Sequence, residues 1–182
     1  MLVNKLFLVF LLAISFSIEA RSCELIDEDF ELNGELVSES MSSNEEEFQK
    51  TLPLTITTML NAGYPKLVGE PNTIAVHIKS DSVTHELLIT HLLDSRQFSK
   101  QIKHQIICDE GRWLIYYKGS STSGGMYRTA ESKTWVTLQE NGALLVHDLV
   151  HRTEGMFFKE NYFHERVVKF QMLNSSELYR NQ

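Results

Sequence analysis

Strand-forming segments separated by turn residues occupy the sequence from Gly111 onward, and this pattern constrains the fold more than any other feature. The segments are rich in apolar and aromatic residues and cover 112–118, 126–139, 143–152 and 156–172. Their separators are residues 119–125, Glu140-Asn141-Gly142 and Thr153-Glu154-Gly155. Asn-Gly is a strong hairpin signal because both residues tolerate positive φ. The pattern predicts an antiparallel meander of four strands.

Upstream of this region, the sequence predicts one further hairpin and two helices. Residues 73–79 alternate apolar and polar side chains, and a turn at 80–82 leads to a partner strand at 86–93. Residues 44–62 and 95–108 place apolar side chains at helical spacing, and each predicts an amphipathic helix. In the first of these segments, an interior Pro53 and a run of threonine and isoleucine leave a strand as the alternative.

These elements together predict a single α+β domain, with one or two helices packed on a curved antiparallel meander sheet. In outline, this order of elements is similar to cystatin-like or nuclear-transport-factor-like architectures. An all-β barrel is the alternative, and it requires both predicted helices to be wrong. A fold of this kind carries no function with it.

The amino terminus has the features of a secretory signal. Lys5 precedes an apolar run over residues 6–18, and Ala20 ends it. The run is shorter than the roughly 20 residues that span a bilayer, so we predict a cleaved signal over 1–20 and no permanent membrane span. Cys23 could carry a lipid, but Ala20-Arg21-Ser22 lacks the usual leucine, and simple cleavage is favoured. The expected localisation is secreted or periplasmic.

The remaining chain is expected to contain an acidic arm, one domain and a frayed tail. Residues 21–43 are acidic and serine-rich without a sustained apolar period, which predicts a loosely packed arm. Residues 44–174 then form the single α+β domain, and residues 175–182 form the tail. Asn174-Ser175-Ser176 matches the acceptor pattern for N-glycosylation, which applies in a eukaryotic secretory pathway.

Both cysteines, Cys23 and Cys108, lie beyond the predicted signal. An even cysteine count in an exported chain predicts a disulfide. The bridge would join the acidic arm to the domain. Two unpaired thiols are the alternative.

The charge distribution argues against nucleic acid as a partner. The chain has a formal net charge of −7, and its acidic excess lies near the amino terminus. A nucleic-acid binder needs a positive surface that displaces phosphate counterions. No motif for a cofactor is present either: the glycine-rich segment 119–125 lacks the lysine of a P-loop and leads into a strand, so a flexible hairpin loop is predicted there.

Histidines and serines on the predicted strands are candidates for metal binding or hydrolysis. His147, His151 and His164 are weak metal candidates, since no recognised ligand spacing connects them. A turn at Thr153-Glu154 would also leave His164 several residues from the other two. For hydrolysis, Ser121 or Ser132 would need a base such as His147 oriented by Asp148. Adjacent strand residues point to opposite faces, so Asp148 cannot orient His147.

A non-enzymatic exported binding or interaction module is therefore the expected function, either a periplasmic accessory protein or a secreted effector. A small exported hydrolase and a carrier of an apolar ligand are the alternatives. The expected partner is a protein or a small apolar molecule. Five aromatic residues could line the cavity of a carrier: Trp113, Tyr117, Trp135, Phe157 and Phe158.

Overall fold

The computed structural model describes residues 22–42, 54–60, 73–93, 98–156 and 159–174. Within these residues, nine strands form one antiparallel sheet in the order β1-β3-β4-β5-β6-β7-β8-β9-β2. The strands are β1 (Asp27–Glu31), β2 (Glu35–Met41), β3 (Thr73–Asp81), β4 (Glu86–Leu93), β5 (Phe98–Asp109), β6 (Arg112–Ser123), β7 (Met126–Leu138), β8 (Leu144–Gly155) and β9 (Glu160–Phe170). A short helix, α3 (Ile56–Leu60), is the one helix in the described residues.

The predicted helix-on-sheet α+β fold is wrong. Residues 98–109 form β5 instead of a helix, because this segment pairs with β4 through residues 98–105 and with β6 through residues 106–109. Ile102 and Ile106 also fit a period of two, with Ile106 buried and its neighbours Gln105 and Ile107 exposed. The apolar spacing alone fits both the helical period of 3.6 residues and the strand period of two, and the backbone pairing with β4 and β6 selects the strand. Of the predicted helix at 44–62, the described part contains only α3.

The predicted hairpin and four-stranded meander are confirmed. Strands β3 and β4 pair in antiparallel fashion, and so do β6 with β7, β7 with β8, and β8 with β9. The expected loop at 119–125 is wrong, because β6 continues to Ser123 and pairs there with Met126. Gly124 and Gly125 alone make the turn, with φ of 58° and 80°. Positive φ at both central residues matches the right-handed twist of the flanking strands.

The predicted loosely packed arm is also wrong over residues 22–42, because both of its strands join the sheet. Strand β1 pairs with β3, and β2 pairs with β9 at the opposite end of the strand order. Phe30 of β1 is fully buried, and a bridge joins it to Met172 just after β9. Apolar residues without a clear period therefore mark real strands here.

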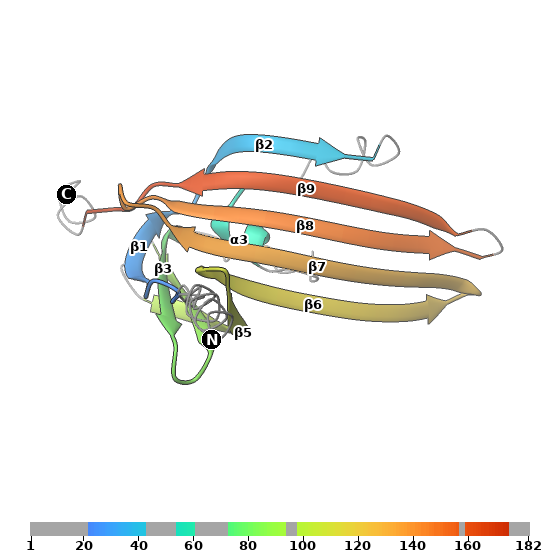
Figure 1. Ribbon diagram of the computed structural model, residues 1–182, viewed down its shortest axis with the longest axis horizontal. Coiled ribbons are helices and arrows are strands. Elements are labelled where there is room, and N and C mark those ends of the chain that lie inside the picture. The colour runs from blue at the N-terminus through green and yellow to red at the C-terminus, as the bar shows by residue number, and fades with distance from the viewer. Residues whose placement is uncertain (1–21, 43–53, 61–72, 94–97, 157–158, 175–182) are drawn as a thin grey trace, which may run out of the picture.

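The hydrophobic core occupies one end of the molecule. Figure 1 shows β6 to β9 and β2 side by side along the long axis, while β1, β3 and β5 gather at one end near α3. Fully buried side chains from these elements meet there, among them Phe30, Ile56, Ile78, Val146 and Phe170. The other halves of β6 to β9 extend beyond this core. We call these halves the extension; it comprises residues 116–123, 126–134, 148–155 and 160–166.

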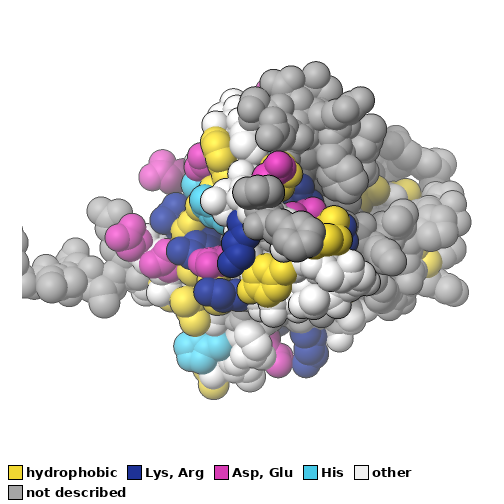
Figure 2. Space-filling model, turned by 90° about the vertical axis from the view of Figure 1, so that its right-hand side faces the viewer, with side chains coloured by type: hydrophobic (Ala, Val, Ile, Leu, Met, Phe, Trp, Pro, Cys, Tyr) yellow, Lys and Arg dark blue, Asp and Glu magenta, His cyan; other side chains and the backbone are white. Residues whose placement is uncertain are grey.

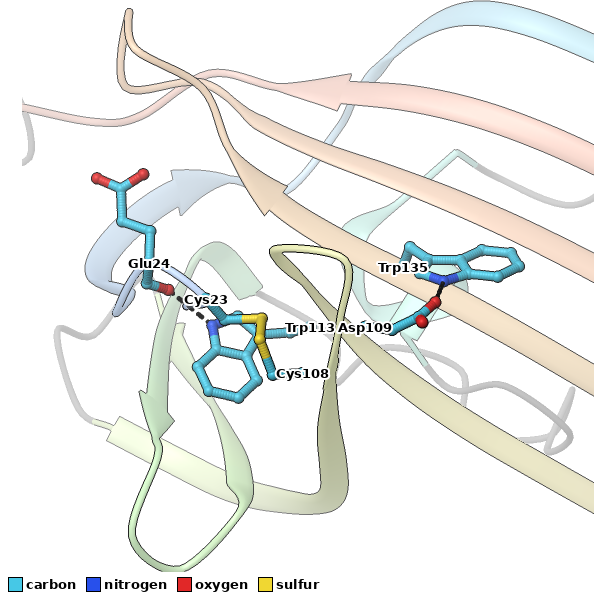
Figure 3. The surroundings of a disulfide bond; sticks show 6 residues. All are labelled: Cys23, Glu24, Cys108, Asp109, Trp113 and Trp135. Atoms are coloured by element: carbon cyan, nitrogen blue, oxygen red, sulfur yellow. Dashed lines mark hydrogen bonds between the residues drawn. A yellow bond between two sulfur atoms is a disulfide. The ribbon is translucent and has the colours of Figure 1, made fainter. Parts of the chain in front are cut away.

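The disulfide fixes the amino-terminal strand to the core. Cys23 and Cys108 are bonded with Cα atoms 5.7 Å apart, which confirms the predicted bridge. In Figure 3 the bond lies beside Trp113, whose indole N–H donates to the Glu24 carbonyl at 2.7 Å. Bridge and hydrogen bond together hold residues 23 and 24 against β5 and β6.

Candidate functional site

A row of buried polar side chains crosses the inner face of the extension, the face continuous with the core. Alternation along each strand and the register between strands bring these residues together. Thr134 lies opposite Asp148, and Asp148 lies opposite Arg166. Ser132 and His164 lie opposite Val150 on its two sides. We call Ser132, Thr134, Asp148, His164 and Arg166 the polar row; all five are buried.

Hydrogen bonds and one ion pair join members of the polar row in two separate groups, Thr134 with Asp148 and Arg166, and His164 with Glu39 of β2. The Thr134 hydroxyl donates to Asp148 Oδ1 at 2.8 Å, and the Arg166 guanidinium lies 3.5 Å from Asp148 Oδ2. His164 Nε2 lies 2.8 Å from Glu39 Oε1 of β2. Because a carboxylate only accepts, Nε2 carries the proton in this bond. His164 of the polar row thus joins β2 to β9 through a side-chain hydrogen bond.

Three buried atoms of the polar row have no hydrogen-bond partner among the described residues: Ser132 Oγ, His164 Nδ1 and Arg166 Nε. A buried donor or acceptor without a hydrogen-bond partner destabilises the folded state, unless another polar group bonds to it. Ser132, Asp148 and His164 are the residue types of a hydrolase, yet their bonds go elsewhere. His164 bonds to Glu39, and Asp148 bonds to Thr134. Asp148 therefore does not orient His164 as a base for Ser132.

Burial raises the pKa of Asp148 above its ordinary value of 3.8, although the Thr134 hydroxyl and the Arg166 guanidinium oppose this shift in part. Desolvation penalises the charged carboxylate more than these two partners favour it. The opposite holds for Asp27 on the exposed surface, where the Lys79 ammonium and then His77 lower the pKa.

These two shifts predict opposite pH dependences for two matched variants. A raised folded-state pKa contributes stability below pH 3.8 that is lost as pH rises through the folded value. Asp148→Asn removes this loss, so its free energy of unfolding relative to the native chain should increase as pH rises above 3.8. Asp27→Asn should instead show a relative decrease as pH rises from the lowered folded value toward 3.8, and little further change above it. Urea unfolding between acidic and neutral pH measures both, and equal slopes would contradict the assignment.

His147 lies on the outer face of the sheet, opposite to the polar row. Its Nε2 lies 2.7 Å from Glu165 Oε1, and its ring lies 5.0 Å from the Trp135 ring. His147 and Asp148 therefore point to opposite faces of the sheet, as predicted. The hydrolase arrangement of Ser132 with His147 is not assembled, because the two residues lie on opposite faces of the sheet.

The weak metal candidates do not converge. His151 shares the outer face with His147 and lies 6.5 Å from the Phe163 ring, while His164 is buried on the inner face. The expected turn at Thr153-Glu154 is wrong, since both residues belong to β8 and His164 lies opposite Val150. In the described residues, no group of three or more His, Cys, Asp or Glu side chains is placed to hold a metal ion.

The aromatic residues suggested for an apolar cavity are divided between two faces. Trp113 is buried in the core on the same face as Tyr117, whereas Trp135 lies on the other face. The indole N–H of Trp135 donates to Asp109 Oδ2 at 2.7 Å, as Figure 3 shows. Residues 157 and 158, the other two candidates, lie outside the described residues.

Strand β2 presents an exposed edge. Among the described strands it pairs with β9 alone, and residues 35–40 are exposed along its length. Leu36 and Val37, two adjacent apolar residues of β2, are 42% and 56% exposed. In Figure 1, β2 lies on the outer side of β9, along the part of β9 nearer the core. Sequence reasoning missed this edge because residues 21–43 showed no clear strand period.

The surface at the far end of the extension has both acidic and basic side chains, and neither sign of charge predominates. Figure 2 looks onto this end and shows hydrophobic, basic and acidic side chains interspersed among the described residues. Arg128 lies 3.6 Å from Glu154, and the Lys159 ammonium lies 5.4 Å from the Tyr127 ring centre. A mixed surface of this kind does not single out a charged ligand.

Comparison with protein-family models, curated proteins and solved structures finds no match to this chain. Within the described residues, no helix has the length and apolarity needed to cross a membrane.

Proposed function

We propose that the chain is an exported, non-enzymatic interaction module that binds an extended polypeptide segment by adding it as a strand beside β2. The exposed edge of β2 is the observation that carries this proposal. A strand at the end of a sheet offers a row of backbone donors and acceptors, and main-chain hydrogen bonds to such a row are a common mode of peptide recognition.

The register of β2 identifies which backbone groups face outward. The Ser42 N–H donates to the Phe163 carbonyl at 3.0 Å, so Ser42 bonds toward β9. Residues of an antiparallel strand bond alternately to one side and the other. Ser40 therefore bonds toward β9 as Ser42 does, and the N–H and C=O groups of Glu39 and Met41 face outward, where an added strand would meet them.

The extension has a second edge, along residues 116–123 of β6, which differs from β2. Strand β5 pairs only with residues 112–115 of β6, so in the part of the chain that the structure describes the remainder of β6 pairs with β7 alone. Lys118 lies near the middle of this edge with its side chain 67% exposed. Exposed lysines on edge strands discourage the addition of another strand. Strand β2 contains neither lysine nor proline, and it is the better docking edge.

Export is part of the same proposal. The disulfide is of the kind that forms and persists in oxidising compartments, which supports a protein that functions outside the cytoplasm. The predicted signal over residues 1–20 lies outside the described residues. We propose secretion or transfer to a periplasm, with cleavage after Ala20. Intact-mass measurement of the exported protein checks the cleavage position.

A proline substitution on β2 tests strand addition directly. Peptides selected by the folded protein from a displayed library of random ten-residue sequences serve as the probe. Glu39→Pro removes an outward N–H and no β2–β9 backbone bond, so peptide binding should weaken at least tenfold. Glu39→Gln loses the same carboxylate and keeps the N–H, and binding should weaken fivefold or less. Equal effects of the two variants, or selected peptides that leave amide exchange at Glu39 and Met41 unchanged, would refute the proposal.

A further inference from the structure

We infer that the segment recognised by β2 carries a basic residue flanked on the same face by apolar residues two positions away on each side. This inference rests on the proposed function, because it names the partner that strand addition at β2 would select. Its basis is the arrangement of three β2 side chains, Leu36, Glu39 and Met41, on the inner face of the sheet.

A β-bulge brings these three side chains to one face. Leu36 pairs with Val168, Glu39 with Arg166 and Met41 with His164, and the register shifts between Leu36 and Ser38. The partners on β9 are alternate residues and share the inner face. Without the extra residue of the bulge, Leu36 and Glu39 would lie on opposite faces, since they are three positions apart.

Glu39 can accept a hydrogen bond from a basic side chain on an added strand. His164 Nε2 occupies Oε1, which leaves Oε2 as a further acceptor, and the Glu39 side chain is 31% exposed. Arg166 lies opposite Glu39 in the register, but its guanidinium reaches Asp148 on the other side at 3.5 Å. Opposite charges on neighbouring strands favour pairing, and like charges oppose it.

Apolar side chains of the partner would cover Leu36 and Met41. Leu36 is 42% exposed and Met41 is half-buried beside the polar row. An added strand would place alternate side chains on the inner face, so its basic residue would lie between two apolar ones. The other face of β2 bears Glu35, which lies opposite Lys169 of β9, and, nearer Glu39, Ser38 and Ser40, whose short hydroxyl side chains set no charge requirement.

A symmetric peptide tests this pattern without assuming a strand direction. Capped Thr-Val-Thr-Lys-Thr-Val-Thr places valine, lysine and valine on one face. It should bind the full chain in fluorescence anisotropy titrations, and replacing its lysine by glutamate should weaken binding about tenfold, since attraction becomes repulsion. Capped Thr-Thr-Val-Lys-Val-Thr-Thr has the same composition with lysine on the face opposite to the valines, and it should bind several-fold more weakly.

Charge exchange supplies the matched control. Glu39→Lys should reverse the preference, binding the glutamate peptide more tightly than the lysine peptide, whereas Glu140→Lys on an exposed turn should leave the preference unchanged. Equal affinity of all three peptides, abolished by Glu39→Pro, would overturn the inferred pattern and leave strand addition intact. If the native chain binds none of them and library selection also yields no peptide dependent on the Glu39 N–H, the proposed function itself fails.

Discussion

Replacing both Cys23 and Cys108 by alanine is expected to lower the free energy of unfolding by about 4 to 5 kcal/mol. The bond closes a loop between residues 85 apart, and removing it restores the conformational freedom of that loop to the unfolded chain. The bond should also stabilise the folded state, because it holds the segment at Cys23 that leads directly into β1. Guanidinium unfolding of the oxidised native chain and the double variant measures the difference.

Reduction of the native protein is the control for this experiment. The reduced native chain and the double alanine variant should unfold at similar denaturant concentrations, since both lack the cross-link. A double variant within about 1 kcal/mol of the oxidised protein would show that the native loop is not the main source of the expected stabilisation. Loss of stability in the variant without any response of the native chain to reductant would assign the effect to packing of the cysteine side chains.

Arg166→Met is expected to destabilise the protein by about 3 to 5 kcal/mol at neutral pH. The variant leaves the Asp148 carboxylate buried beside the Thr134 hydroxyl without its cation, and an uncompensated buried charge is costly. Burial already raises the pKa of Asp148, so the carboxyl can take up a proton instead. The deficit should therefore shrink as pH falls, because a protonated carboxyl does not need the guanidinium.

A double variant separates the ion pair from the packing of its members. Asp148→Leu combined with Arg166→Met replaces both charges with apolar groups and should recover most of the stability lost in Arg166→Met. Urea unfolding of the native chain, both single variants and the double variant completes the cycle. Additive losses in the double variant would mean that the two side chains act independently.

The strand meander could be predicted from local sequence because its signals are short-range. Gly142, directly after Asn141, and Gly124-Gly125 supply positive φ where the chain reverses, and the segments between them alternate with a period of two. The opposite orientation of His147 and Asp148 follows from the same alternation. The disulfide could be predicted because the chain contains two cysteines and a signal-like amino terminus.

The secondary structure of residues 98–109 could not be decided from the local sequence. Their apolar spacing fits an amphipathic helix and also fits a strand, and hydrogen bonds to β4 and β6 favour the strand. The same applies to β1 and β2, whose apolar residues have no regular period. Strand β1 forms because Phe30 is buried in a core assembled from distant segments. Such contacts depend on residues far apart in the chain, which no local window contains.

The exposed edge of β2 and the polar row arise only in the tertiary structure. Glu39 meets His164 across 125 positions of sequence, and a bulge in β2 turns Leu36 toward the same face. The sequence by itself determined where the chain can turn and which residues must alternate, because these depend on neighbouring backbone dihedrals and the strand period. The order of the strands determined which side chains became neighbours and which edge stayed open, because strand pairing at long range fixes both.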